Sequence, residues 1–218
     1  MPKALIVWGG WQGHAPRETA ELLEAMLGGH GYDTIVTADI AALGAPSVKD
    51  MDLVIPYVTN AELDKQAALN LVAAVRAGTG LAGHHAALAT SFRQSTDFHF
   101  VTGVQWVAHP GGIIDFRVDV TRPDDPIMAG IETFAYRSEQ YYLHYDPSVE
   151  ILATTTFTGE YDPAVAGVVM PVVFKRRFGA GRVFYSALGH LPAELEHAAA
   201  RTIIERGLLW ATRRKDDQ

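Results

Sequence analysis

The residues with the clearest chemical potential are two adjacent histidines, His84 and His85, that follow a short apolar run. The segment Leu81–Leu88 passes from apolar residues through Gly83 to the histidines and then into small helix-forming residues. This order is typical of a strand, a sharp turn and a helix, an arrangement that lifts the side chain at the turn above the edge of a parallel sheet. His85 occupies the place that a serine or cysteine nucleophile takes in such turns, so the sequence predicts imidazole chemistry there.

Only one of these two histidines is expected to enter a pocket, because adjacent residues of a strand point to opposite faces of the sheet. A turn that begins between them would be the exception. We assign His85 to the site itself and His84 to a packed position behind it, where it supports substrate binding.

Four further histidines lie where a site would be expected, since ligands of open α/β sheets bind beyond the carboxyl ends of the strands. His14 lies in the loop after the first predicted strand, and His190 follows a late one. His109 lies in a loop rich in aromatic residues and glycine, and His144 follows the acidic and aromatic segment 138–142. The remaining histidines are interpreted as surface or connector residues: His30, His99 and His197.

Aromatic residues accompany these histidines and suggest a ligand with flat apolar faces. Trp and Tyr rings pack against the C–H faces of sugar rings, while histidine and carboxylate groups satisfy the hydroxyls. The group comprises Trp11, Trp106, Tyr141 and Tyr142, of which Trp11, Trp106 and Tyr142 are assigned to substrate binding. The alternative interpretation is that these rings belong to the core.

The elements that position these residues alternate between strand and helix as far as residue 92, which predicts a parallel sheet with helices on both faces. Central strands are expected at residues 3–8, 52–58 and 80–84. A helix is expected to begin at Pro16, because proline favours a first helical position. A capping box at Thr59–Glu62 is expected to open a second helix.

Beyond residue 92 the pattern changes to extended segments with hairpin-like spacing. Extended structure is expected at residues 113–121 and, around a glycine-rich turn, at 170–187. A final helix is expected to begin at Pro192 and to cover the sheet. Because no Pro-, Gly- or Ser-rich linker interrupts the chain, we expect one three-layer α/β domain over residues 1–218.

The composition excludes several classes of protein. The 218 residues carry a formal net charge of −7, which disfavours binding to nucleic acid or to an anionic membrane. The basic run Lys175–Arg177 is expected to be the solvated end of a strand. The chain has no cysteine, so disulfides and a Cys-dependent amidotransferase reaction are excluded. No apolar segment approaches the roughly 20 residues of a membrane span, and no signal sequence is recognised, so a cytoplasmic protein is expected.

Together, these motifs resemble those of the trehalose-utilisation, or ThuA-like, family. The similarity is carried by four segments, of which the last is the most specific: Gly83–Ala87, Ala108–Pro110, Ser138–Tyr142 and Gly179–His190. Ser138 stands where the family motif has an aspartate, so a role that needs two adjacent carboxylates is not expected.

This resemblance implies a flavodoxin-like sheet similar to that of class I glutamine amidotransferases, and a role connected with sugars. It also implies a pocket lined by the histidines named above and one carboxylate: His14, His85, His109, Glu139 and His190.

The chemistry of this pocket is interpreted in two ways. In the first, His85 and His190 are the acid and base, because imidazole exchanges protons near neutral pH, and Glu139 orients one of them. In the second, His85, His109 and His190 hold Zn²⁺ or Mn²⁺, since neutral imidazoles with a carboxylate suit such metals and leave room for water.

Two classes of function therefore compete. The first is an enzyme, such as a hydrolase, lyase or isomerase, that acts on a carbohydrate or an oxidised (keto) sugar. The second is a non-catalytic sugar-binding or regulatory module on an amidotransferase-like scaffold, which would bind sugar without turnover. In both cases the expected partner is a small sugar, and assembly into a homo-oligomer is compatible with the sequence.

Overall fold

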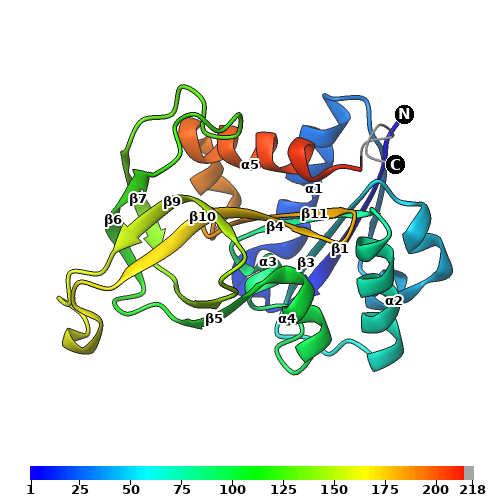
Figure 1. Ribbon diagram of the computed structural model, residues 1–218, viewed down its shortest axis with the longest axis horizontal. Helices are drawn as coiled ribbons and strands as arrows, with labels where there is room; N and C mark the ends of the chain where they lie inside the picture. Colours follow the sequence, from blue (N-terminus) through cyan, green and yellow to red (C-terminus); the bar gives the residue numbers. More distant parts are fainter. Residues whose placement is uncertain (214–218) are drawn as a thin grey trace.

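The computed structural model describes residues 1–213, so residues 214–218 of the expected domain lie outside the described part. A nine-stranded sheet runs through the molecule and has helices on both faces (Figure 1). Its strand order is β2-β1-β3-β4-β11-β10-β9-β6-β7. The expected three-layer α/β architecture is confirmed. The parallel strands form one half of the sheet, and the predicted site residues His14, His85 and His190 follow three of them.

The parallel half contains the central strands that the apolar runs predict. Its strands are β1 (Lys3–Gly10), β2 (Asp33–Thr37), β3 (Leu53–Thr59), β4 (Gly80–His84) and β11 (Gly181–Ser186). β3 is buried along its whole length, as expected for a parallel strand that is covered on both faces. Gly10 lies opposite Thr59, and His84 lies opposite Ser186. The carboxyl ends of these strands therefore meet at one edge.

The helices form the two outer layers. α1 (Pro16–Gly28) and α5 (Ala198–Ala211) cover one face, and α2 (Lys65–Arg76), α3 (Ala86–Ala89) and α4 (Thr96–Thr102) lie on the other (Figure 1). α1 begins at the proline that predicts it. Short 3₁₀ helices connect the elements at Gln12–His14, Ile40–Gly44, Pro46–Asp50, Pro163–Val165 and Pro192–Glu196.

The antiparallel half extends the sheet beyond β11. Its strands are β10 (Val169–Phe178), β9 (Glu150–Thr156), β6 (Ile113–Val120) and β7 (Phe134–Glu139). β10 and β11 form the predicted hairpin. A separate antiparallel pair joins β5 (Val104–Ala108) to β8 (Tyr142–Tyr145). No pattern in the sequence predicts β5, β7 or β8, and these strands lead to Glu139 and to the His109 loop.

The prediction that a helix begins with a capping box at Thr59 is wrong. Thr59 is the last residue of β3 and remains paired with Gly10. α2 begins at Lys65 instead, where the Asp64 side chain accepts hydrogen bonds from two backbone N–H groups of the first turn. Asp64 supplies the N-cap because its carboxylate reaches those donors, whereas the strand holds Thr59 at the sheet edge.

The final helix is divided in two rather than continuous from Pro192. A 3₁₀ helix covers Pro192–Glu196, and α5 begins at Ala198. His197 separates them with an extended backbone (ψ 113°), and its ring stacks on Phe134 with a centroid distance of 5.0 Å.

The basic run on β10 is not the solvated end of a strand. Lys175 and Arg176 are buried, and only Arg177 is exposed. The Lys175 ammonium is paired with the Asp125 carboxylate, and Arg176 lies 3.5 Å from a carboxylate oxygen of Asp146. The run lies in the interior of the sheet because β10 is flanked by β11 and β9.

Candidate functional site

The turn between β4 and α3 places His85 in the site. β4 ends at His84, and His85 has φ +48° and ψ −109°, so the turn begins between the two histidines. This backbone conformation is rare for a residue with a side chain and is held by its neighbours. The His85 N–H donates to the Ser186 carbonyl at 2.7 Å, and the Tyr185 hydroxyl donates to the His85 carbonyl at 2.9 Å.

The His85 ring is fully buried (0% exposed), and its contacts define which nitrogen carries a proton. Nδ1 lies 3.1 Å from the Ala187 carbonyl oxygen. Because a carbonyl only accepts hydrogen bonds, Nδ1 is the protonated nitrogen, and the neutral ring presents a lone pair at Nε2. Nε2 lies 3.1 Å from Glu139 Oε2, 3.1 Å from His190 Nδ1 and 2.7 Å from the Tyr141 hydroxyl.

Four side chains meet around this nitrogen, and we call them the His–Glu cluster: His14, His85, Glu139 and His190. One nitrogen or carboxylate oxygen from each lies within 4.8 Å of the others. The His14 ring is 5.1 Å from that of His85 and 5.0 Å from that of His190, measured between centroids. The four residues follow β1, β4 and β11 or end β7, so the fold brings together side chains that are distant in sequence.

Burial and mutual contact set the charges of the cluster. Burial, with the neighbouring His85 and His190, lowers the pKa of His14 to about 3. Burial, with His85, also lowers the pKa of His190. For Glu139, burial acts to raise the pKa, but the hydrogen bond that His85 donates when its ring is protonated, together with the positive charges of protonated neighbouring histidines, lowers it to about 2. At neutral pH, His14 and His190 are therefore uncharged and stand beside an ionised carboxylate.

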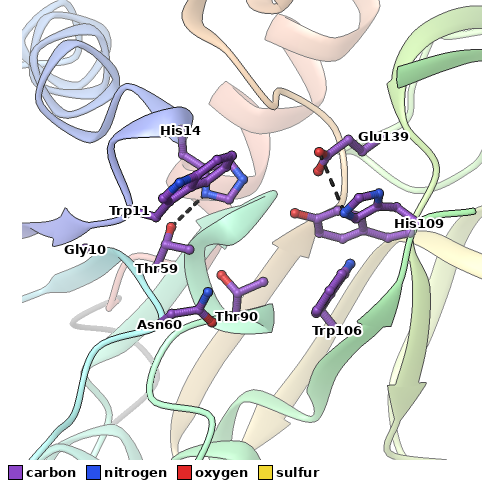
Figure 2. A pocket seen from close by; sticks show the side chains of 10 residues that line it. Gly10, Trp11, His14, Thr59, Asn60, Thr90, Trp106, His109 and Glu139 are labelled. Atoms are coloured by element: carbon purple, nitrogen blue, oxygen red, sulfur yellow. Dashed lines mark hydrogen bonds and ion pairs between the residues drawn. The ribbon is translucent and has the colours of Figure 1, made fainter. Parts of the chain in front are cut away.

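A cavity of about 520 Å³ opens against the cluster. Figure 2 shows Trp11 and His14 on one side of it and Trp106 and His109 on the other. Trp11 is 55% exposed, and the Trp106 ring lies 5.4 Å from the His109 ring. The cavity is lined by Gly10, Trp11, His14, Thr59, Asn60, Thr90, Trp106, His109, Glu139 and Tyr141. It thus combines two aromatic walls with polar groups.

His84 lies in a packed position behind the turn, as expected, and Tyr142 lies outside the cavity. The His84 ring is 5.1 Å from that of Tyr57, and its Nδ1 donates to the Leu188 carbonyl. Tyr142 packs its ring against Phe157, at 5.8 Å. Neither residue lines the cavity, which corrects the place expected for Tyr142 and leaves His84 only an indirect part in substrate binding. Tyr141 lies in the wall instead.

His109 also differs from its expected place among the metal ligands. Its Nε2 lies 3.8 Å from Glu139 Oε1 (Figure 2). Oε2, the other carboxylate oxygen, faces His85 and His190 instead. The His109 side chain is 36% exposed. The structure groups His14 and Glu139, rather than His109, with His85 and His190.

Four cavity residues were not predicted from the sequence: Gly10, Thr59, Asn60 and Thr90. Tyr141 was grouped with the candidate aromatic residues but was not assigned to substrate binding. Thr59 could have been identified as a site residue, because it ends a buried strand at the carboxyl edge of the sheet. However, the sequence around it resembles a helix cap. Its hydroxyl shares a 2.8 Å hydrogen bond with His14 Nδ1. For Thr90, which follows the short α3, no local pattern indicates a place in the cavity.

The imidazoles and the carboxylate of the His–Glu cluster lie at the carboxyl edge of the parallel strands. Because α/β proteins bind their ligands at this edge, it is the candidate active site. The family model ThuA, described as trehalose utilisation, matches residues 3–211, and the chain belongs to this family. A comparison with curated proteins found no match. Within residues 1–213, no helix has both the length and the apolar character needed to cross a membrane.

Solved structures share the fold. A ThuA-like protein from Bacteroides uniformis has a TM-score of 0.78 and 16% identity, covering 96% of this chain and 91% of that one. A ThuA-like protein from Parabacteroides merdae has a TM-score of 0.76 and 17% identity, covering 100% and 99%. A cytoplasmic protein from Salmonella typhimurium has a TM-score of 0.61 and 12% identity, covering 98% and 100%.

Proposed function

We propose that the protein is an enzyme that acts on a carbohydrate or on an oxidised (keto) sugar. Its family provides the connection with sugar utilisation. The proposal rests on the contact among the four side chains of the His–Glu cluster, two of which, His14 and Glu139, line one cavity. Burying imidazoles and a carboxylate in contact costs free energy, and such groups are typical of functional sites. Action in the cytoplasm is in keeping with the Salmonella protein of the same fold.

The cavity suits a sugar in size and lining. Its volume of about 520 Å³ lies within the range of roughly 300–1,000 Å³ that is usual for small-molecule sites. Trp11 and Trp106 present flat faces on opposite walls, and such rings pack against the C–H face of a pyranose. Asn60 and Thr90 offer hydrogen-bonding groups for hydroxyls.

The cluster can transfer protons in this cavity. His85 presents a bare Nε2, which makes it the candidate base, and the Glu139 carboxylate at 3.1 Å stabilises the imidazolium that forms. His190, at 3.1 Å from the same nitrogen, is the candidate acid. In a keto sugar these groups would move a proton beside the carbonyl. The same donor set suits Zn²⁺ or Mn²⁺, which would polarise a sugar oxygen instead.

A non-catalytic sugar-binding module is the competing function, and the burial of His85 favours it. Because the His85 side chain has no exposed surface, it could act on a substrate only through another group or after a change of conformation. Such a module would bind sugar saturably and would tolerate His85→Gln.

Turnover separates the two. The full chain is incubated with disaccharides and with their keto forms, and products are followed by mass spectrometry. We expect turnover by the wild type and none by His85→Ala or His190→Ala, with far-UV circular dichroism showing that both variants fold. Saturable binding without any turnover by the wild type, retained in His85→Gln, would reject the enzyme and support the module.

A further inference from the structure

We propose that the His–Glu cluster binds a divalent first-row transition metal ion, with His14 and Glu139 as ligands beside His85 and His190. Three imidazole nitrogens and one carboxylate oxygen form a donor set suited to Zn²⁺, and to Mn²⁺ as second choice. This inference rests on the proposed function, for which it names the group that acts on the sugar.

The spacing of the four donors fits one ion. Zinc lies about 2.0–2.2 Å from nitrogen and oxygen ligands, so two ligands of a tetrahedral ion lie roughly 3.4 Å apart. His85 Nε2 lies 3.1 Å from both His190 Nδ1 and Glu139 Oε2, and His190 Nδ1 lies 3.5 Å from the same oxygen. All four donors lie within 4.8 Å of one another, so a small movement of His14 closes the site.

The hydrogen-bonding roles of the atoms at the centre of the cluster favour a bound cation. Because Nδ1 is hydrogen-bonded to the Ala187 carbonyl, His85 turns Nε2 toward the cluster. In the neutral ring Nε2 carries a lone pair, and it lies 3.1 Å from a Glu139 oxygen, which in the carboxylate also only accepts. The Tyr141 hydroxyl can donate to one of them but not to both. A proton between them would satisfy one contact, whereas a metal ion satisfies all four donors together.

The outer nitrogens are held as those of metal-binding histidines are. Such histidines almost always donate the other ring N–H to a carboxylate, carbonyl or similar oxygen, which fixes the tautomer and the orientation of the ring. His85 Nδ1 is held by the Ala187 carbonyl, and His14 Nδ1 by the Thr59 hydroxyl at 2.8 Å. Both arrangements leave Nε2 as the ligand atom.

A bound ion would also explain how the buried histidines could act on a sugar in the cavity. His85 and His190 are buried, while His14 and Glu139 line the cavity. Expansion from four to five ligands, which zinc allows, would let a sugar oxygen or a water bind the ion on the cavity side. His109, beside the outer oxygen of Glu139, would then lie next to that bound group as a positioning residue rather than a ligand.

The test uses the full chain after treatment with a chelator. Elemental analysis before treatment, and calorimetric titration with Zn²⁺ and separately with Mn²⁺ after it, are expected to give about one ion per chain. Loss of an outer partner typically weakens metal binding 10- to 100-fold, so loss of a ligand in His14→Ala or Glu139→Gln is expected to weaken Kd by at least about 100-fold. Glu139→Gln keeps the side-chain shape and guards against misfolding.

Two histidine variants serve as matched controls. His30→Ala removes an exposed histidine paired with Glu205 and should leave Kd unchanged. His109→Ala should weaken Kd by less than about 10-fold, since it removes no ligand and its Nε2, at 3.8 Å from Glu139 Oε1, makes no hydrogen bond to one. Titration with Co²⁺ adds a spectroscopic readout, because the visible absorption band of the bound ion changes when a ligand is lost, even in a variant that still binds.

Several results would overturn the metal site. These are binding by the wild type no tighter than by His14→Ala and Glu139→Gln, or a loss in His109→Ala as large as in His14→Ala. Undiminished sugar turnover by the metal-free protein would also overturn it, while leaving the proposed enzyme intact. Conversely, metal binding as expected but no turnover of any sugar would reject the proposed function and keep the site.

Discussion

At the scale of single residues, the site depends on how each ring is oriented by its hydrogen-bond partners. His14 is the clearest case, because its Nδ1 has the Thr59 hydroxyl as partner, and Thr59 is buried at the end of β3. Placing the ring correctly is therefore a task of the strand end as much as of the histidine.

Thr59→Val tests this support. Valine keeps the volume of threonine but removes the oxygen, so the His14 ring loses its partner. We expect Zn²⁺ binding to weaken about 10- to 100-fold, measured by calorimetry. Thr59→Ser keeps the hydroxyl and should bind nearly as the wild type does. Equal affinity in the valine and serine variants would show that this bond does not orient His14.

Trp11 tests the aromatic wall. Its ring is 55% exposed and borders the cavity, so it contributes little to the core. Stacking contacts of this kind contribute about 0.5–1.5 kcal/mol, so Trp11→Ala should weaken sugar binding roughly 2- to 12-fold without lowering Tm. Phe100→Ala removes a similarly exposed ring outside the cavity and is the control. If both variants bind sugar alike, Trp11 does not hold the ligand.

At the scale of elements, β10 shows why a local pattern fails. A run of three basic residues is usually solvated, yet Lys175 lies in the interior of the sheet and is neutralised by Asp125, a residue that only tertiary structure brings near. The pair is buried, so its two charges depend on each other.

Lys175→Met should therefore destabilise the fold strongly. Removing one partner of a buried pair leaves an uncompensated charge, which typically costs about 3–5 kcal/mol. The measurement is urea unfolding. Arg177→Met, two positions along the same strand but exposed, should change the free energy of unfolding by no more than about 0.5 kcal/mol. Similar values for the two variants would contradict the role given to the pair.

Helix α4 contains a histidine that makes stability depend on pH. Burial lowers the pKa of His99, and its Nδ1 donates to the Val104 carbonyl at 2.9 Å. Because the folded pKa lies below the unfolded one, protonation favours the unfolded chain. The contribution of His99 is therefore present above the ordinary histidine pKa of about 6.5 and is lost as pH falls below it.

His99→Gln should lose less stability on acidification than the wild type does. Glutamine can still donate to Val104 but takes up no proton. Urea unfolding of both proteins above and below pH 6.5 measures the difference. Other buried histidines add their own dependence, and comparison with the variant isolates His99. Parallel curves for the two proteins would contradict this prediction.

At the scale of the whole molecule, the sequence predicts the parallel half of the sheet well, because each buried strand is a continuous local apolar run. β5, β7 and β8 escape prediction because they are short and partly exposed, and long-range pairing decides whether they form.

The candidate site follows the same division. His14, His85 and His190 were predictable from their places after strands, by the rule that ligands bind at the carboxyl edge. The choice between Tyr141 and Tyr142 was not, because it depends on where β8 begins. That His14 rather than His109 belongs to the cluster also depends on three-dimensional packing, and no local pattern in the sequence indicates it.

The metal ion and the sugar can be located together in a crystal structure of the wild-type chain with zinc, soaked with a keto-disaccharide and recorded at the zinc absorption edge. We predict an anomalous peak about 2.0–2.2 Å from the nearest atoms of His14, His85, Glu139 and His190. Sugar density should lie between Trp11 and Trp106, with one oxygen directed at the peak. Sugar bound elsewhere, or a cluster that holds only a proton and no anomalous scatterer, would contradict the account.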